Sequence, residues 1–240
     1  MFNNTLILEV GGNYINEYKN NRIIEHDLAS FQELGIYVKR KRVYIILSGE
    51  EINIRLLKFP KIKEKELYDL INNELYYNFR NTDNLVFAYT LIKSSNINDE
   101  FAVFCLNMDK IALIEKSVSF NTNIKGVYLL QFCILNFFKA KIKNRNFIFL
   151  FKYMENIYLL HILNDVVIHN TVFKDYGIEE DLLFEFNKFI EEVLTYTDKN
   201  IDMVYTLNMS KDQYLNLVED KLKFEDLGDL NIKRIIRSII

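Results

Sequence analysis

The sequence predicts an α/β (α+β) fold of two related halves, with a small α+β subdomain inserted in the first half. One observation is an internal repeat: three antiparallel strands, a helix and a strand open the chain, and the same order begins again near Asn144. Another is an additional α+β group that interrupts the first copy. The third is composition: half of the 240 residues are hydrophobic and the net charge is −3, which excludes a disordered chain. The expected domains are residues 1–145, containing the inserted subdomain 50–117, and residues 146–240.

The first half is expected to begin with a meander of short strands. The segment TLILEV is rich in β-favouring apolar residues, and the Gly11-Gly12 pair after it is typical of a tight turn. Asn20-Asn21 marks the second turn. Gly35 suits the C-terminal end of a weak helix. The elements expected here are strands over residues 5–10, 14–18, 22–25 and 42–47 and a helix over 28–34.

In the insert, alternating apolar residues over 52–59 predict a strand that ends at Pro60. The clearest helix of the chain follows over 61–79, because four aliphatic side chains share one face and charged residues surround them. Those four are Leu67, Leu70, Ile71 and Leu75. The remaining elements expected up to the second half are strands over 85–92, 100–106 and 123–128 and helices over 109–120 and 129–141.

The second half repeats the opening order. The Asn164-Asp165 pair is a turn signal between two apolar runs. A strongly amphipathic segment over 181–196 predicts a helix with its apolar side turned inward. The elements expected here are strands over 146–153, 156–163, 166–173 and 201–207 and helices over 181–196, 211–221 and 231–240.

Composition and charge narrow the possible functions. The chain has 7 glycines and one proline, and glycine is about half as frequent as usual. Loops that cradle phosphates need glycine so that the backbone can approach the ligand. With 30 basic and 33 acidic side chains, the chain lacks the basic surface that nucleic-acid binding usually requires.

The reactive side chains give no catalytic or metal-binding pattern. Cys105 and Cys133 lie in apolar runs without Cys-x-x-Cys spacing, so we expect buried reduced thiols. His161 and His169 lie on neighbouring predicted strands without a carboxylate or cysteine cluster, so no metal site is expected. The longest nearly apolar run is too short to cross a membrane, and no signal peptide is recognisable. These features favour a cytoplasmic protein.

The internal duplication with an inserted subdomain resembles the actin-like superfamily, whose halves are ribonuclease H-like. The stretch YIILSGEEINIRLLKFPKIKEKELYDLINNELYYNF narrows the resemblance to the PilM family of type IV pilus assembly proteins. Phe59-Pro60, Glu66-Leu67 and Glu74 fit the family's motif. The sequence departs from it at Asn78, where the family has proline, and at Ala88, where it has aspartate. The cytoplasmic domain of GspL, a type II secretion protein, is the nearest alternative.

Active actin-like proteins use three glycine-bearing elements to hold a nucleotide, and the resemblance places their counterparts here. Glu9, Gly11 and Gly12 stand in the first phosphate turn, with Glu in place of Asp. The second turn is expected within residues 151–154, which contain neither carboxylate nor glycine. The third is expected at residues 208–210 and also lacks glycine. We therefore expect no enzymatic activity and no required cofactor, while residual ATP binding stays open.

The resemblance implies a scaffold that binds the short N-terminal cytoplasmic peptide of a PilN-like membrane protein and contacts the assembly ATPase. The expected location is the inner face of the cell membrane. The candidate groove walls could equally be ordinary core. They are Ile54, Leu56, Leu57, Phe59, Leu75, Tyr76 and Phe79. A basic run, with a solvated turn as the alternative interpretation, could face anionic lipid. It consists of Lys39, Arg40, Lys41 and Arg42.

Overall fold

The structure is a computed structural model, and it describes the chain with several gaps. The described residues are 5–12, 14–19, 22–27, 41–80, 85–107, 123–174, 180–196, 201, 203–211 and 222–239. The helices expected over 28–34 and 109–120, and that over 211–221 beyond Lys211, lie outside these residues.

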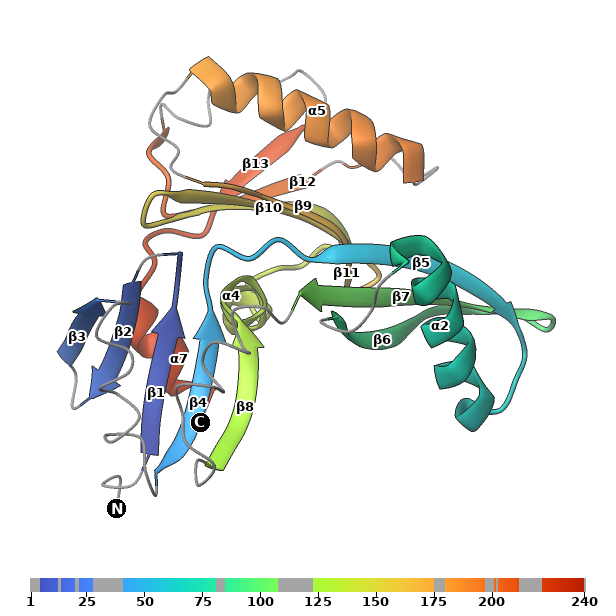
Figure 1. The fold of residues 1–240 in the computed structure, drawn as a ribbon. Coiled ribbons are helices and arrows are strands. Elements are labelled where there is room, and N and C mark those ends of the chain that lie inside the picture. The colour runs from blue at the N-terminus through green and yellow to red at the C-terminus, as the bar shows by residue number, and fades with distance from the viewer. Residues whose placement is uncertain are drawn as a thin grey trace. The chain divides into compact units, whose positions relative to one another are not determined.

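The first half forms a five-stranded sheet whose order is β3-β2-β1-β4-β8. The three strands of the opening meander pair antiparallel, and β4 then pairs parallel to β1 and β8 parallel to β4. Figure 1 shows these five strands side by side in that order. Their bounds are β1 Thr5–Val10, β2 Tyr14–Lys19, β3 Arg22–Asp27, β4 Arg42–Leu47 and β8 Asn123–Leu129.

The second half forms another five-stranded sheet with the same topology, in the order β11-β10-β9-β12-β13. Its meander is antiparallel, and β12 and β13 add in parallel. The two matching sheets confirm the duplicated α/β fold expected from the repeat. The bounds are β9 Asn146–Tyr153, β10 Asn156–Leu163, β11 Val166–Phe173, β12 Met203–Leu207 and β13 Lys223–Asp226.

Strand β13 is not predicted by the sequence. Its four residues, KFED, include three charged side chains and are too few to show a period. The strand lies at the sheet edge, where one flank stays solvated and charge is tolerated. Parallel pairing with β12, from Met203 to Thr206, defines it rather than any local preference.

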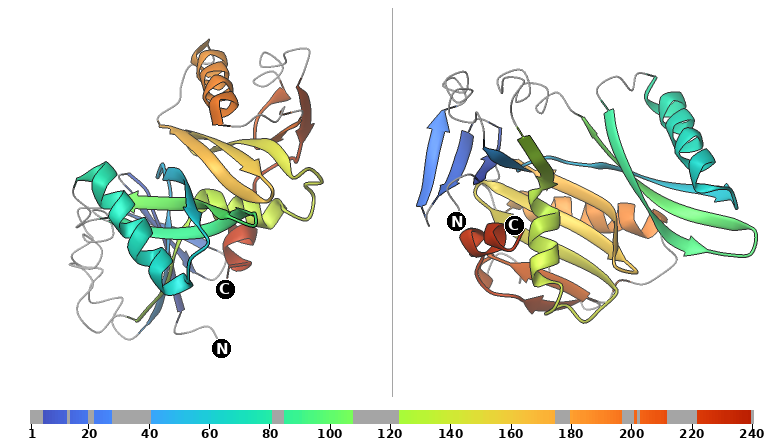
Figure 2. Two further views of the ribbon diagram at one scale, coloured as in Figure 1. Left: turned by 90° about the vertical axis from the view of Figure 1, so that its right-hand side faces the viewer. Right: turned by 90° about the horizontal axis from the view of Figure 1, so that it is seen from below.

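The insert forms a separate three-stranded sheet, in the order β5-β7-β6, with one helix against it. The left view of Figure 2 shows helix α2 lying across this sheet. The helix carries Glu64 and Glu66 in its first turn, where carboxylates are favoured by the helix dipole, and Arg80 ends it in the left-handed conformation. The bounds are β5 Asn53–Pro60, α2 Glu64–Phe79, β6 Leu85–Ser94 and β7 Asn98–Asn107.

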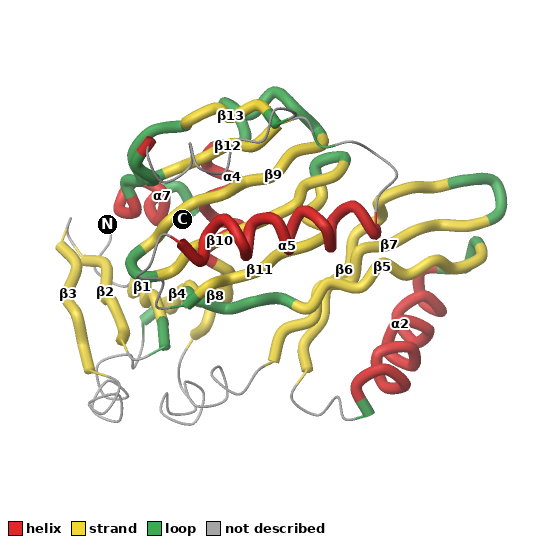
Figure 3. Tube along the Cα trace, turned by 90° about the horizontal axis from the view of Figure 1, so that it is seen from above, coloured by secondary structure: helices red, strands yellow, loops and turns green. Residues whose placement is uncertain are grey.

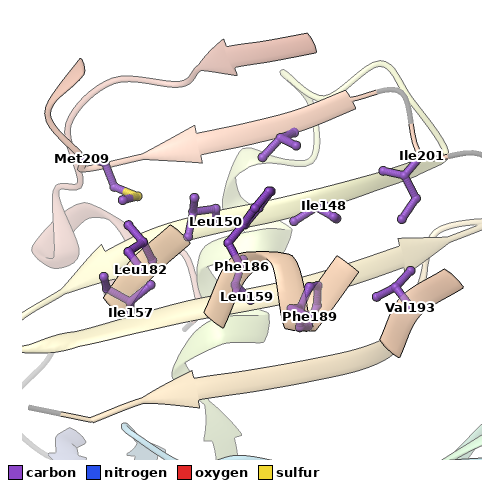
Figure 4. Close-up of a cluster of buried hydrophobic side chains, with 11 residues drawn as sticks. Ile148, Leu150, Ile157, Leu159, Leu182, Phe186, Phe189, Val193, Ile201 and Met209 are labelled. Atoms are coloured by element: carbon purple, nitrogen blue, oxygen red, sulfur yellow. The ribbon is translucent and has the colours of Figure 1, made fainter. Parts of the chain in front are cut away.

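Helix α5, Glu180–Tyr196, covers one face of the second sheet, as Figure 3 shows from above. Its inward side chains, among them Phe186 and Phe189, pack on apolar residues of β9 and β10. Figure 4 shows this cluster, in which Ile148, Leu150 and Leu159 are fully buried. Burial of such large side chains is the main stabilising term of this half.

Two further helices, α4 Leu130–Phe138 and α7 Ile232–Arg237, contact each other. The guanidinium of Arg234 lies 5.6 Å from the ring centre of Phe137, a cation–π geometry. Asn231 caps α7, because its side chain accepts a hydrogen bond from the Arg234 amide. Both helices are shorter than the segments expected over 129–141 and 231–240.

Contact density divides the chain into two compact units. The first sheet, α4 and α7 belong to one, and the insert belongs with the second sheet to the other. The domains 1–145 and 146–240 expected from the sequence remain a prediction. The units are Met1–Glu50 with Asp109–Ile142 and Leu230–Ile240, and Glu51–Met108 with Lys143–Asp229.

Candidate functional site

The β1–β2 turn places Glu9 in a buried network of tyrosine hydroxyls. The Glu9 carboxylate is fully buried and accepts hydrogen bonds from Tyr14 Oη at 2.9 Å and Tyr18 Oη at 2.5 Å. Asn16 Nδ2 lies 3.5 Å from the second oxygen. Tyr14 Oη also lies 2.6 Å from Ser48 Oγ at the end of β4. Each oxygen of the Glu9 carboxylate therefore accepts a hydrogen bond from a tyrosine hydroxyl.

Gly11 is packed closely by the same tyrosine. A Cβ atom built on Gly11 would lie 2.2 Å from Tyr14 Cε1, so the ring occupies the space above this glycine. The Gly11 amide donates to the Tyr14 carbonyl at 3.0 Å. It is therefore already paired and not directed at a ligand. Gly12, by contrast, is exposed and has no atom near its Cβ position.

In the second unit, one residue in each of the two segments where the resemblance expects the other glycine elements has a backbone conformation that glycine favours. Met154 in the β9–β10 turn has φ 52° and Asn208 after β12 has φ 55°. The Asn208 side chain donates to the Lys152 carbonyl at 2.9 Å, and its amide donates to the Gly228 carbonyl at 2.9 Å. Asn208 thus ties together three backbone segments at the place where the resemblance expects a glycine pair.

The predicted groove residues of the insert fall on two different sides of its sheet. Four of them belong to the core between the sheet and α2, which is the ordinary alternative considered for them. Leu75 is almost fully buried there, whereas Tyr76 points outward with 62% of its surface exposed. Those four are Leu57, Phe59, Leu75 and Phe79.

Ile54 and Leu56 lie on the opposite face of the sheet, because strand residues alternate between faces. The register places Leu56 beside Ala102 of β7, and Ala102 lies across from Thr90 of β6. Leu56 is 42% exposed and Val86 of β6 is 47% exposed. We call this side the outer face of the insert. Its described apolar members are Ile54, Leu56, Val86, Ala88, Ala102, Phe104 and Leu106.

The basic run is only partly described. Lys39 and Arg40 lie outside the described residues, while Lys41 is half-buried and Arg42 is exposed at the start of β4. The interpretation as a lipid-facing patch therefore stays a prediction.

The buried titratable groups do not suggest chemistry. Burial raises the pKa of both the Cys105 and Cys133 thiols to about 11, so they are protonated and poorly nucleophilic at neutral pH. Burial, with a smaller contribution from His169, lowers the pKa of His161 to about 4. His169 Nε2 lies 3.1 Å from Glu192 Oε2 of α5 and stacks on Phe189. Among the described residues, no group of three metal-binding side chains occurs.

The polar side chains that surround Glu9 were not predicted from the sequence. The sequence predicts Tyr14 and Tyr18 only as residues of a strand. Tyr14, Asn16 and Tyr18 alternate along β2, and Glu9 lies opposite Asn16. Polar side chains alternating opposite a lone carboxylate could have indicated this network.

No protein-family model matches the sequence, and no curated protein matches it. Solved structures do match over almost the whole chain. A chain of a PilM–PilN type IV pilus biogenesis complex superposes with a TM-score of 0.63 at 12% identity, covering 98% of this chain and 90% of that one. The cytoplasmic domain of EpsL, an inner-membrane component of the Vibrio cholerae type II secretion system, gives 0.56 at 8% identity, covering 98% and 94%.

A third match is a Bacteroides thetaiotaomicron protein with an actin-like ATPase fold and unknown function. Its TM-score is 0.51 at 13% identity, covering 98% of this chain and 95% of that one. The chain therefore has the actin-like fold. The likeness to PilM and to a type II secretion component, expected from the sequence, is confirmed at the level of the fold. Among the described helices, none is long and apolar enough to cross a bilayer.

Proposed function

We propose that this protein is a non-enzymatic scaffold of a type IV pilus assembly machine that binds an extended N-terminal peptide of a PilN-like membrane protein. The observation that carries the proposal is the fold, shared over nearly the full length with a chain of a PilM–PilN complex. The assembly ATPase and the inner face of the membrane, with the basic run against anionic lipid, are the further contacts that the proposal includes.

The condition of the nucleotide elements supports a binding role rather than hydrolysis. Glu9 accepts hydrogen bonds from two tyrosine hydroxyls, and the ring of Tyr14 lies over Gly11. The side chain of Asn208, after β12, donates a hydrogen bond to the Lys152 carbonyl of β9. A phosphate needs backbone N–H groups that point at it without a competing partner. Calorimetry with Mg-ATP tests this part, and low-micromolar affinity would contradict it.

The outer face of the insert is our candidate for the peptide surface. Leu56 and Val86 expose large apolar side chains on its two edge strands, whereas the face under α2 is filled by core. An extended peptide would place alternate apolar side chains against such a surface. The nearby Lys58–Glu100 ion pair, at 3.3 Å on the same face, would border it with charge.

A matched pair of variants on strand β6 tests this surface. Val86→Asp adds a charge to the outer face, and Leu91→Asp adds one at a similarly exposed position whose register partner, Phe101, belongs to the core under α2. We expect Val86→Asp to weaken binding of a PilN-like N-terminal peptide about ten-fold or more and Leu91→Asp to leave it nearly unchanged. Absence of wild-type binding at ~100 μM peptide would count against the function itself.

One finding favours a second candidate. The cytoplasmic domain of EpsL, a type II secretion component, matches with a TM-score of 0.56. The same fold therefore also occurs in a secretion machine, and a coupling role in such a machine is the second candidate. Binding of a secretion-system partner, with no response to any PilN-like peptide, would favour this alternative.

A further inference from the structure

Helix α5 carries three exposed apolar side chains outside the side that packs on its sheet. Its inward side chains fill the core of the second unit. On the other side, Leu183 is 40% exposed, Phe184 is 69% exposed and Leu194 is 51% exposed. Leu183 and Leu194 are separated by three helical turns and therefore lie in one line along the helix, with Phe184 beside its start.

This row is unusual for a solvated helix surface. Isolated exposed leucines need no explanation, but here three large exposed apolar side chains, with the half-buried Ile190 between Leu183 and Leu194, occur on one helix. Phenylalanine has no polar atom that would favour a wet position. The stable core beneath shows that these side chains are not needed to attach α5 to the sheet, because Phe186, Phe189 and Val193 already do so.

Charge indicates what would cover the row. The helix contains five acidic side chains and one lysine, a net charge of −4. Glu191 is exposed and follows Phe184 by seven residues, so the two lie on the same side of the helix, and Lys188 is the single positive charge of the helix. A second copy of α5 would bring two acidic helices together, and an anionic lipid surface would also repel this helix. A basic partner complements it.

We propose that the outer side of α5 is a second interaction surface, which binds a basic amphipathic helix of a partner protein. Apolar side chains of that helix would pack on Leu183, Phe184 and Leu194, and its lysine or arginine side chains would pair with Glu191. This surface lies on α5, which packs on the second sheet, and it shares no residue with the outer face of the insert. A scaffold with two such surfaces can hold two partners.

The test uses the full chain and a fluorescent 18-residue amphipathic helix built from leucine and lysine. We expect binding with a Kd in the range of ~10 μM that weakens at higher salt, and at least about ten-fold weaker binding of the same helix with glutamate in place of lysine. The double variant Phe184→Ser, Leu194→Ser should weaken binding of the basic helix by about ten-fold. Glu191→Lys should weaken it further at low salt.

Helix α2 provides the matched control. It also carries a net negative charge and exposed apolar side chains, Leu70 at 39% and Tyr77 at 84%. The variant Leu70→Ser, Tyr77→Ser should leave binding unchanged. Equal loss in both double variants would show attraction to acidic helices in general and would overturn the proposal. It would also be overturned if wild type self-associated, or bound anionic vesicles, through the residues lost in the α5 variant.

Discussion

The side-chain amide of Asn170 makes two hydrogen bonds with the backbone of Ile52, 118 positions away in the sequence. Its Oδ1 accepts from the Ile52 amide at 3.1 Å, and its Nδ2 donates to the Ile52 carbonyl at 2.6 Å. Both residues are buried. Ile52 directly precedes β5 of the insert and Asn170 lies on β11, the edge strand of the second sheet. The side chain therefore substitutes for a strand neighbour that this backbone segment lacks.

Removal of the two hydrogen bonds between Asn170 and Ile52, which we call the Asn170 clamp, should destabilise the protein measurably. Asn170→Ala leaves a buried amide and carbonyl of Ile52 without these partners, and each costs about 1–3 kcal/mol when desolvated and unpaired. We expect the free energy of unfolding to fall by about 2–4 kcal/mol in urea titrations. Asn78→Ala is the control, because Asn78 bonds to the exposed Glu74 carbonyl and should cost under about 0.5 kcal/mol. Similar losses in both variants would contradict the role of the clamp.

The clamp also marks a limit of sequence-based prediction. Strand periodicity and the repeat were sufficient to predict the two halves and the insert, because the meanders and α2 have clear patterns. Contacts such as Asn170–Ile52 depend on which strands the tertiary fold brings together, and nothing in the local pattern carries this information. Strand β13 was missed for the same reason.

The sequence predicted which segments carry the candidate site, but not which side chains in them are buried, exposed or in contact. Phe59-Pro60 correctly located the end of β5. Alternation along β5 could have assigned Leu57 to the core and Leu56 to the opposite face, but which face α2 covers required the structure. The absence of glycine from residues 151–154 and 208–210 can be read from the sequence. The position of the Tyr14 ring over Gly11 cannot, because it depends on tertiary packing.

Gly11 and Gly12 should differ sharply in their tolerance of alanine. A Cβ on Gly11 would overlap the Tyr14 ring, whose hydroxyl is bonded to Glu9 and Ser48, so the ring cannot move without loss of these bonds. We expect Gly11→Ala to cost about 1–3 kcal/mol. Gly12→Ala, with open space around its Cβ, should be within about 0.5 kcal/mol of wild type.

Chemical denaturation of the two variants measures this difference. A third variant checks its cause, since Gly11→Ala should cost less in a Tyr14→Ala background, where the ring is gone. Full additivity of these two substitutions would show that the overlap is not the source of the loss.

Replacement of Met154 by glycine should stabilise the protein. It occupies the left-handed region with φ 52° in the β9–β10 turn, which costs an L-residue about 1–2 kcal/mol. Its side chain is 45% exposed, so little packing would be lost. We expect Met154→Gly to raise the midpoint of thermal unfolding and to increase the free energy of unfolding by about 1 kcal/mol. The neighbouring turn residue provides the comparison: Glu155 does not have positive φ, so Glu155→Gly should destabilise by about 0.5–1 kcal/mol. A lower midpoint for Met154→Gly would contradict the strain.

His161 should make the fold acid-sensitive. The side chain is fully buried on β10, and its Nε2–H donates to Asn146 Oδ1 at 3.0 Å, since a carbonyl oxygen can only accept. Nδ1 has no hydrogen-bond partner among the described residues. A second proton would therefore sit buried and unpaired, and burial lowers the pKa of His161 from 6.5 to about 4.

The sign of the pH dependence follows from this direction. Between about pH 6.5 and pH 4 the unfolded chain binds a proton at His161 that the folded protein does not, so the free energy of unfolding falls as the pH falls through this window. The loss at this site approaches about 3 kcal/mol below pH 4 and is absent above pH 7. His161→Gln keeps a donor for Asn146 but cannot titrate, so its stability should change less with pH by this amount. Urea titrations at pH 7.5, 6, 5 and 4 compare the two proteins, and an equal slope for wild type and His161→Gln would show that another group controls the acid response.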